Sequence, residues 1–368
     1  MSTPAAVTVR PMREDERETV RAMFQRSFAG LKRWFFFSWT PDVLVAERDG
    51  QLAGVVMADT YPLGAGRTGG CVAWIFTAPE ARGTGIGHRL IDAALELFDS
   101  YGCDEVTAIV ESTNTGSSRL FATRGFGILS FGQQLRRYRW WLPGQWWRWR
   151  HLGAIGHFVW ARPGPGRPDS PTAQWWATVA LTALLGLFVL WRGAGFGAVD
   201  PTAVVAVPVL CLLFFAARWW AMRWTAAAKG LQVRFRAWES GFLVSAVVAV
   251  ALGGFFPVAG GAYPQSPEWC YRDALPVLGP AAVAGVLPAL VLTAAAWALE
   301  TWGGVPGPVA PWLSYAQMLG APLVLFDTAV IVFPFFAFNG RRIRDWNPRL
   351  WVPLAVAAVA VSLAGTFW

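Results

Sequence analysis

The sequence predicts an α/β domain followed by an all-α polytopic transmembrane domain. Three observations support this division of the 368 residues. Residues 1–140 are rich in charges and alternating apolar patterns, whereas residues 173–368 are dominated by Ala, Val, Leu, Phe, Trp and Gly. A strand, a glycine-rich turn and a helix follow one another within residues 71–98. The second half holds several apolar runs about as long as a membrane crossing requires.

The glycine-rich turn is the first sign of a binding site. It reads Arg82-Gly83-Thr84-Gly85-Ile86-Gly87, between the apolar run 71–76 and a helical pattern at 90–98. Glycines let the backbone approach a ligand closely, and the free N–H groups and dipole of a helix N-terminus attract an anion. The turn therefore predicts a phosphate site formed by the backbone N–H groups of Gly83 to His88. Alone, the same pattern also fits an ordinary strand-to-helix turn.

A second motif follows about thirty residues later. It reads Asn114-Thr115-Gly116-Ser117-Ser118-Arg119-Leu120-Phe121, and ends in Arg124-Gly125-Phe126. The two motifs, in this order, resemble the R-x-x-G-x-G and N-x-x-(S/A)-x-x-L-(Y/F)-x-x-x-G-F motifs of the GCN5-related N-acetyltransferases, the GNAT superfamily. The resemblance covers roughly residues 6–140. Plain helix packing would also explain the apolar pair Leu120-Phe121.

The order of predicted elements agrees with the resemblance. Strands are expected at 7–10, on both sides of Asp49-Gly50, at 71–77, at 106–110 and near 128–138, with helices at 13–28, 84–99 and 115–124. The resemblance implies a mixed sheet flanked by helices, in which two strands splay apart around the pantetheine arm of acetyl-CoA. The residues implied to bind this co-substrate are Ile75, Phe76, Thr77, Arg82, Gly83, Thr84, Gly85, Ile86, Gly87, His88, Asn114 and Ser117.

Acetyl transfer in this family is a direct attack of an amine on the thioester, which needs an oxyanion donor and a base or water path. Many members place a Tyr, as acid for the departing thiolate, where this chain has Phe121. The thiolate then leaves unassisted, or activity is weak. Because no Glu lies on the 71–77 strand, we expect Glu111 to be the catalytic base, with Asp59 a poorer candidate.

Residues 141–172 are expected to form a juxtamembrane linker between a domain at 1–140 and one at 173–368. The net charge is +8, and many arginines and tryptophans gather between residues 136 and 167. Such a mixture suits single-stranded nucleic acid or a membrane surface. Next to apolar segments we favour the lipid bilayer as partner and expect no nucleic acid. His151 and His157 lack a nearby third metal ligand, so interfacial positions are favoured.

The membrane domain is expected to have about five or six spans, at 173–191, 202–220, 277–299, 321–338 and 350–367, with a further apolar stretch at 241–258. Basic segments mark the cytoplasmic side. Because residues 136–167, 218–236 and 341–349 are basic, the N-terminal domain is expected in the cytoplasm. A complete crossing at 241–258 makes the count odd, so we expect residues 237–264 to enter the membrane and return on the same side.

The membrane half also resembles site-2 proteases, which are intramembrane zinc enzymes. Leu278-Gly279-Pro280 and the run from Phe333 to Arg342 carry this resemblance, with Asn339 where the metal-binding Asp would stand. No His follows His157, so we expect a scaffold without a metal. Asp327 lies near the middle of an expected span, as a packing residue or in a polar cavity, and Glu239 is expected at the interface.

Four cysteines without a C-x-x-C pattern indicate neither a disulfide framework nor a zinc knuckle, and residues 1–10 lack the apolar core of a signal peptide. We therefore expect an integral, multi-pass membrane N-acetyltransferase that uses acetyl-CoA and acts on a cytoplasmic amine. The acceptor and any protein partner are not identified. The alternative is a non-catalytic acyl-CoA sensor with a metal-free, site-2-protease-like domain.

Overall fold

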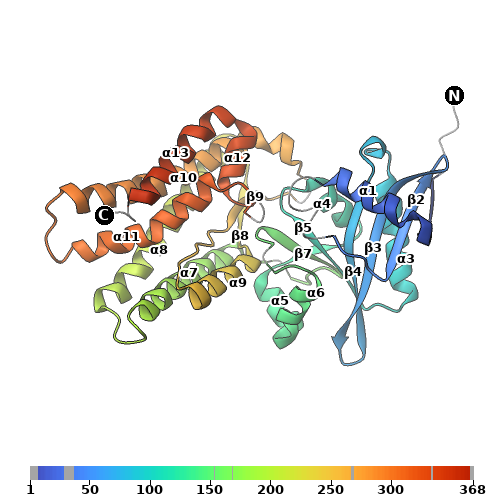
Figure 1. Cartoon of the computed structure of the whole chain (residues 1–368), viewed down its shortest axis with the longest axis horizontal. Helices are drawn as coiled ribbons and strands as arrows, with labels where there is room; N and C mark the ends of the chain where they lie inside the picture. The colour runs from blue at the N-terminus through green and yellow to red at the C-terminus, as the bar shows by residue number, and fades with distance from the viewer. Residues whose placement is uncertain are drawn as a thin grey trace. The chain divides into compact units, whose positions relative to one another are not determined.

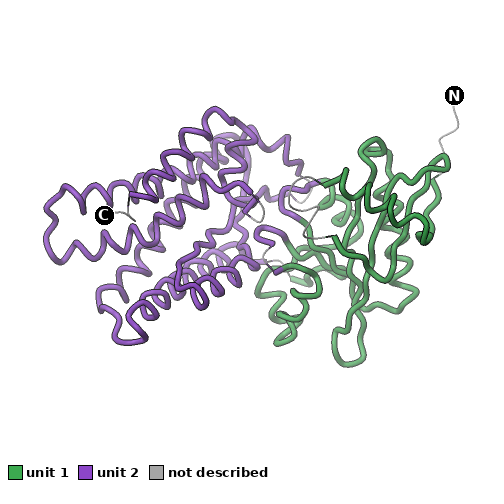
Figure 2. Tube along the Cα trace, in the orientation of Figure 1, with its two compact units in different colours: residues 1–110, 116–151, 158–167 green, residues 111–115, 152–157, 168–368 purple. Residues whose placement is uncertain are grey.

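The computed structural model describes residues 7–28, 37–152, 154–167, 169–266, 269–332 and 335–364 (Figure 1). The chain divides into two compact units, coloured separately in Figure 2. The first contains residues 1–110, 116–151 and 158–167, and the second contains residues 111–115, 152–157 and 168–368.

A seven-stranded mixed sheet is the centre of the N-terminal half. Its order is β1-β2-β3-β4-β5-β7-β6; β1 to β4 are antiparallel, β4 and β5 are parallel, and β6 and β7 are antiparallel. The strands are β1 (Val7–Pro11), β2 (Asp42–Arg48), β3 (Gln51–Gly64), β4 (Arg67–Thr77), β5 (Glu105–Glu111), β6 (Gly127–Leu129) and β7 (His157–Arg162). The expected mixed α/β fold is confirmed.

Helices flank this sheet. They are η1 (Glu14–Glu16), α1 (Arg17–Ser27), η2 (Pro79–Ala81), α3 (Ile86–Ser100), α4 (Thr115–Ala122), α5 (Phe131–Tyr138), η3 (Arg139–Trp141) and α6 (Leu142–Arg148). On the apolar face of α3, Leu90, Ile91 and Phe98 are completely buried. Val55 and Val56 of β3 are completely buried as well. Burial of such side chains is worth roughly 1.5–3 kcal/mol each, so α3 is anchored firmly.

The expected hairpin at Asp49-Gly50 is present. Arg48 pairs with Gln51, and the two turn residues have φ angles of +52° and +76°. Two successive positive φ angles give the tight turn whose twist matches antiparallel strands, which favours Asn-Gly and Asp-Gly pairs.

The parallel strands β4 and β5 separate towards their carboxyl ends. They pair only from Gly69 opposite Glu105 to Val72 opposite Ala108, although β4 continues to Thr77 and β5 to Glu111. On its other edge β4 has a register shift, because Met57 pairs with Trp74 while Ala58 pairs with Val72. Such a bulge adds one residue and bends the strand. The bulge therefore marks where β4 leaves β5.

The closing strand expected near 128–138 is wrong beyond Leu129. Ser130 caps a helix instead: its side chain accepts a hydrogen bond from Gln133 N at 3.3 Å, and Gln133 Oε1 accepts one from Ser130 N at 2.8 Å. This reciprocal capping box starts α5 at Phe131. The stretch expected to be a linker, residues 141–172, contains the last residue of η3, α6, the additional strand β7 and the first two residues of α7.

The second unit is mainly helical. Its elements are α7 (Pro171–Gly193), α8 (Pro201–Ala228), β8 (Val233–Arg236), α9 (Glu239–Val247), the π-helical turn η4 (Val248–Leu252), β9 (Gly261–Pro264), α10 (Tyr271–Trp302), α11 (Ala310–Val324), the π-helical turn η5 (Leu325–Ala329), α12 (Asn339–Trp346) and α13 (Pro348–Ala364). Among the described residues, three helices are long and apolar enough to cross a membrane: α7, α8 and α10.

The expected spans at 173–191, 202–220 and 277–299 lie inside these three helices. The expected span at 321–338 is wrong as a single helix. Helix α11 already begins at Ala310, continues as the π-helical turn that contains Asp327, and gives way to extended backbone at Val330. The span expected at 350–367 falls mostly within α13, and residues 365–367 lie outside the described ones.

Residues 237–260 leave β8 and return to β9. The two short strands pair antiparallel, with Val233 opposite Pro264 and Arg236 opposite Gly261. Between them the chain forms α9, turns at Gly253 with a φ of +67°, and comes back without a second helix. This is the connectivity expected of a segment that enters and leaves on one side. Its depth in a membrane stays a prediction.

Candidate functional site

The glycine-rich turn forms an open cradle at the start of α3. Gly85 is the N-cap residue with a φ of +83°, and Gly83 has a φ of +77°, so both adopt backbone conformations that favour glycine. A Cβ atom added to either would meet nothing within 4 Å. The Thr84 hydroxyl donates to Ala81 O at 2.7 Å and holds the turn. The backbone is thus fixed while its outer side remains free for a ligand.

Arg124, which was not predicted as a site residue, stabilises the start of α3. Arg124 donates to both carboxylate oxygens of Asp92, at 2.6 and 2.8 Å, and to His88 O at 3.1 Å. Its guanidinium lowers the pKa of Asp92. The bidentate pair joins the end of α4 to the first turns of α3. In the sequence, Arg124 could have been found as a candidate because it stands before Gly125 in the second motif.

The free edge of β4 offers backbone groups to the gap beside β5. Ala78 N donates to Ala53 O at 3.0 Å, and backbone groups alternate in direction along a strand. Phe76 therefore faces β3, whereas Ile75 and Thr77 point their backbone groups away from it. Consistently, Thr77 O accepts from the Ser27 hydroxyl at 3.2 Å.

This alternation corrects one expected contact. The backbone of Phe76 pairs with Val55 in the ladder, and its ring is buried against Phe24 at a centroid distance of 5.5 Å. Phe76 is thus a core residue, and of the 75–77 run only Ile75 and Thr77 direct their backbone groups away from β3. Their contact with the co-substrate stays a prediction.

Glu111, the expected base, ends β5 at the gap. Its carboxylate accepts from Arg341 Nη1 at 2.6 Å and from the Thr113 hydroxyl at 3.0 Å. All three residues belong to the second compact unit, which includes residues 111–115. Asn114 is exposed and Ser117 is half-buried in the first turn of α4. The base candidate is therefore held by an ion pair.

Phe121 and Asp59, the two other residues considered for catalysis, lie in different parts of the domain. The Phe121 ring is buried and packs edge-on against Phe126 at 5.1 Å. Asp59 pairs with Cys71, on the part of β4 that is still joined to β5. Burial raises the pKa of the Cys71 thiol to about 12, so it stays protonated at neutral pH. The preference for Glu111 over Asp59 as the base stays a prediction.

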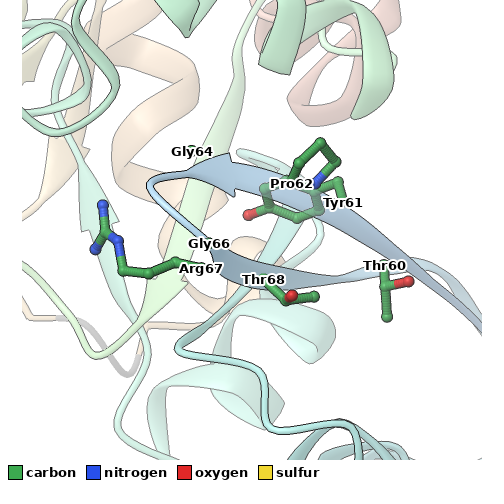
Figure 3. Close-up of a pocket in the computed structure, with 7 residues that line it drawn as sticks. All are labelled: Thr60, Tyr61, Pro62, Gly64, Gly66, Arg67 and Thr68. Carbon is green, nitrogen blue, oxygen red and sulfur yellow. The ribbon is translucent and has the colours of Figure 1, made fainter.

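A separate cavity of about 350 Å³ lies at the β3–β4 turn. Figure 3 shows Thr60, Tyr61 and Pro62 on one strand, with Arg67 and Thr68 on the other. No residue expected to bind the co-substrate lines it.

Tyr61 and Tyr138 both donate to the buried Glu105 carboxylate, which also pairs with Arg137 at 2.5 Å. Burial is the main cause that raises the pKa of both tyrosines.

Comparison with known families settles what the cradle and the splayed strands belong to. The model of the acetyltransferase (GNAT) family matches residues 9–126. This part of the chain is a GNAT domain. A mycothiol acetyltransferase from Thermobispora bispora is 37% identical over 84 residues, which are 22% of this chain and 28% of that protein. The chain thus matches little more than a quarter of that relative's length.

Among solved structures, the GNAT domain is similar to Arabidopsis thaliana Naa50 in complex with the bisubstrate analogue CoA-Ac-MVNAL. That chain is 13% identical, with a TM-score of 0.32, and the match covers 42% of this chain and 97% of that one. A protein named "Putative zinc metalloprotease MJ0611" from Methanocaldococcus jannaschii is 27% identical over 150 residues, or 40% of this chain and 73% of that protein.

The polar cluster of the helical half involves Asn339, the residue that replaces a metal-binding Asp in the site-2 protease resemblance. Its side-chain amide donates to Asp327 at 3.0 Å, and Asp327 also accepts from Arg218 Nε at 2.8 Å. All three residues are at most 1% exposed. Within the described ranges, no group of three or more His, Cys, Asp or Glu side chains gathers as metal ligands would. Asp327 is a buried residue whose carboxylate forms an ion pair with Arg218.

Proposed function

We propose that this protein is a membrane-anchored, acetyl-CoA-dependent N-acetyltransferase that acts on a cytoplasmic amine. The observation that carries the proposal is the open Gly83–Gly85 cradle at the start of α3, next to the gap between β4 and β5. A helix N-terminus and close backbone approach suit a pyrophosphate, and a gap between splayed strands suits an extended pantetheine arm. The apolar helices α7, α8 and α10 would supply the anchor.

Each part of the site has a separate task. The N–H groups of Gly83 to His88 would hold the phosphates, with Arg82 and Thr84 shaping the turn. The N–H of Ile75 faces the gap and would donate to the oxygen on which negative charge develops. Acetyl-CoA would supply the activated thioester. Glu111 would take the proton from the attacking amine, while Asn114 and Ser117, beside it, would contact the co-substrate or an ordered water.

The orientation follows from the distribution of positive charge. The segments 136–167, 218–236 and 341–349 are basic, whereas residues 300–312 contain no Lys or Arg. By the positive-inside rule the GNAT domain, residues 1–140, would lie in the cytoplasm, where acetyl-CoA is available. Residues 173–368 would form the multi-pass membrane domain.

Full-length protein in detergent tests the proposal. Acetyl-CoA should raise its thermal midpoint, because a ligand that binds only the folded state stabilises it. A panel of amines, from peptides with free N-termini to polyamines and amino sugars, should include one that accelerates release of coenzyme A. Failure of acetyl-CoA to shift the midpoint at millimolar concentration would remove the basis of the proposal.

A non-catalytic acyl-CoA sensor is the second candidate. Two observations favour it: Phe121 has no hydroxyl to protonate a departing thiolate, and the Glu111 carboxylate is engaged by Arg341. A sensor would bind acetyl-CoA as the enzyme does but would release no coenzyme A with any amine of the panel. Turnover above the spontaneous rate with one amine excludes this candidate.

A further inference from the structure

A basic pocket that shares no lining residue with the glycine cradle lies on the GNAT-containing unit. Its volume is about 440 Å³, and it is formed by the end of β6, by α5 and by the segment that follows β7. The lining residues are Leu129, Gln133, Arg136, Arg137, Pro165, Gly166 and Arg167. Three of the seven are arginines and none is acidic, so the pocket suits an anion.

The pocket is built from well-held parts. Gln133 donates to Arg167 O at 2.9 Å, which ties the segment after β7 to α5. Arg137 donates to Pro163 O at 3.0 Å and pairs with Glu105 at 2.5 Å. Among the described residues, no ion pair within 4.0 Å holds Arg136 or Arg167, and both are exposed. Arg137 thus fixes the wall, and the other two arginines carry uncompensated charge.

Exposed aromatic residues cluster in the same stretch of chain. The first unit has five exposed large hydrophobic residues among those described, and four of them fall between 135 and 147: Leu135, Trp140, Trp141 and Trp147. Trp140 and Trp147 are 72% and 75% exposed. Trp140 stacks on Trp141 at a centroid distance of 3.8 Å. Exposed tryptophans beside arginines are typical of a surface that contacts lipid headgroups.

The covalent chain keeps this pocket near any bilayer that α7 enters. Helix α7 begins at Pro171, four residues after Arg167, and four extended residues span at most ~14 Å. Trp175 and Trp176 lie in its second turn, where interfacial aromatics are common. Surface charge on an anionic membrane acts over about 8 Å at physiological salt. The Arg167 end of the pocket therefore lies at most ~14 Å from the start of α7.

We propose that the pocket of Gln133, Arg136, Arg137 and Arg167 binds the phosphate of an anionic phospholipid, while Trp140, Trp141 and Trp147 lie in the headgroup region. The inference rests on α7 crossing a membrane, as in the proposed function, but not on acetyl transfer. Zwitterionic lipids carry a compensating ammonium, so phosphatidylglycerol should be preferred over phosphatidylcholine. This contact would hold α5 and α6 against the bilayer.

The test uses the full-length protein in nanodiscs of phosphatidylcholine, with or without phosphatidylglycerol. Phosphatidylglycerol should slow hydrogen exchange of residues 131–150 and should be retained in native mass spectrometry. The double variant Arg136→Glu/Arg167→Glu should bind phosphatidylglycerol at least tenfold more weakly, since each basic residue near an anionic surface contributes ~1 kcal/mol. The matched control is Arg17→Glu/Arg48→Glu, which makes the same charge change at an exposed position of α1 and a half-buried position of β2.

Three results would overturn the proposal. The wild-type protein could show no preference for phosphatidylglycerol, the control could lose as much binding as the pocket variant, or inorganic phosphate in detergent could protect residues 131–150 as well as the lipid does. The neutral variant Arg136→Gln/Arg167→Gln guards against misfolding caused by charge reversal. Acetyl-CoA binding should be unchanged in every variant, so failure here is separate from failure of the proposed function.

Discussion

Arg218 of α8 and Asp327 of the π-helical turn η5 form a two-pronged ion pair inside the helical half, with Nε to Oδ2 at 2.8 Å and Nη2 to Oδ1 at 3.0 Å. Both side chains are 2% exposed. Asn339 adds backbone and side-chain donors to the same carboxylate, at 3.2 and 3.0 Å. Helix α8, the turn η5 and the start of α12 are thus joined through one buried carboxylate.

Removal of one partner should therefore be costly. Asp327→Asn leaves the Arg218 charge buried without a counter-ion, which typically costs ~3–5 kcal/mol. We expect a clear fall in the thermal midpoint of the full-length protein in detergent. The double variant Arg218→Met/Asp327→Leu should recover much of the loss, because neither charge is then buried.

The exposed pair Arg17–Glu14 provides the control. Its side chains are 50% and 81% exposed at 3.1 Å, so Glu14→Gln should cost less than ~1 kcal/mol. An Asp327→Asn protein as stable as the wild type would show that the ion pair does not hold the three segments together.

Gly85→Glu should weaken acetyl-CoA binding by at least tenfold, or ~1.4 kcal/mol. The added side chain brings bulk and a negative charge into the cradle, where the co-substrate phosphates would lie. Isothermal titration of the full-length protein measures the effect. The control is Gly102→Glu, at the other end of α3, where φ is +65° and an added Cβ also meets nothing within 4 Å.

Both substitutions strain a left-handed backbone position and add the same charge. A difference between them therefore reports the ligand and not the fold. Equal binding by the Gly85→Glu variant and the wild type would show that the cradle is not the co-substrate site.

The sequence predicted the fold well where short-range rules decide. The turn at Asp49-Gly50, the glycine cradle and the helix from Ile86 all follow from local backbone preferences. Long-range contacts were not predictable in the same way. The resemblance implied that two strands splay apart, but it did not give the register shift near Ala73 where β4 leaves β5. Arg341 meets Glu111 across 230 positions of sequence. The helix at Phe131 was missed because the Ser130–Gln133 capping box was read as part of a strand.

Phe121→Tyr should not increase turnover, although many relatives of this family have Tyr at the corresponding motif position. The ring is 2% exposed and packs against Phe126, so a new hydroxyl would be buried there, at a cost of ~1–3 kcal/mol if it finds no partner. We expect a lower thermal midpoint and an unchanged rate of coenzyme A release. Phe131→Tyr, at a half-buried position, is the control. A faster Phe121→Tyr enzyme would place this ring at the reacting sulfur.

Glu111→Gln should lower the turnover number by about 100-fold and leave acetyl-CoA affinity unchanged, because a general base contributes to proton transfer and not to co-substrate binding. Arg341→Gln removes the ion pair but keeps the carboxylate, so its effect on turnover should be smaller. Steady-state kinetics with the best amine of the panel, together with titration calorimetry, separates the two. If both variants lose stability equally and keep the wild-type rate, Glu111 is only a structural partner of Arg341.

The last prediction concerns acid stability. The Glu16 carboxylate accepts from Arg10 Nη2 at 2.6 Å and from Arg13 N at 2.8 Å, and the Arg10 hydrogen bonds are the main cause that lowers its pKa from about 4.5 to about 2. A carboxylate with a lowered folded pKa stabilises the protein fully above its unfolded pKa. That stability is lost as the pH falls from about 4.5 through about 2. Wild-type protein should therefore exceed Glu16→Gln in thermal midpoint at pH 7, and the difference should vanish near pH 2. Glu18→Gln, at an exposed position of α1, should show no such pH-dependent difference, and a constant gap for Glu16→Gln would contradict the assignment.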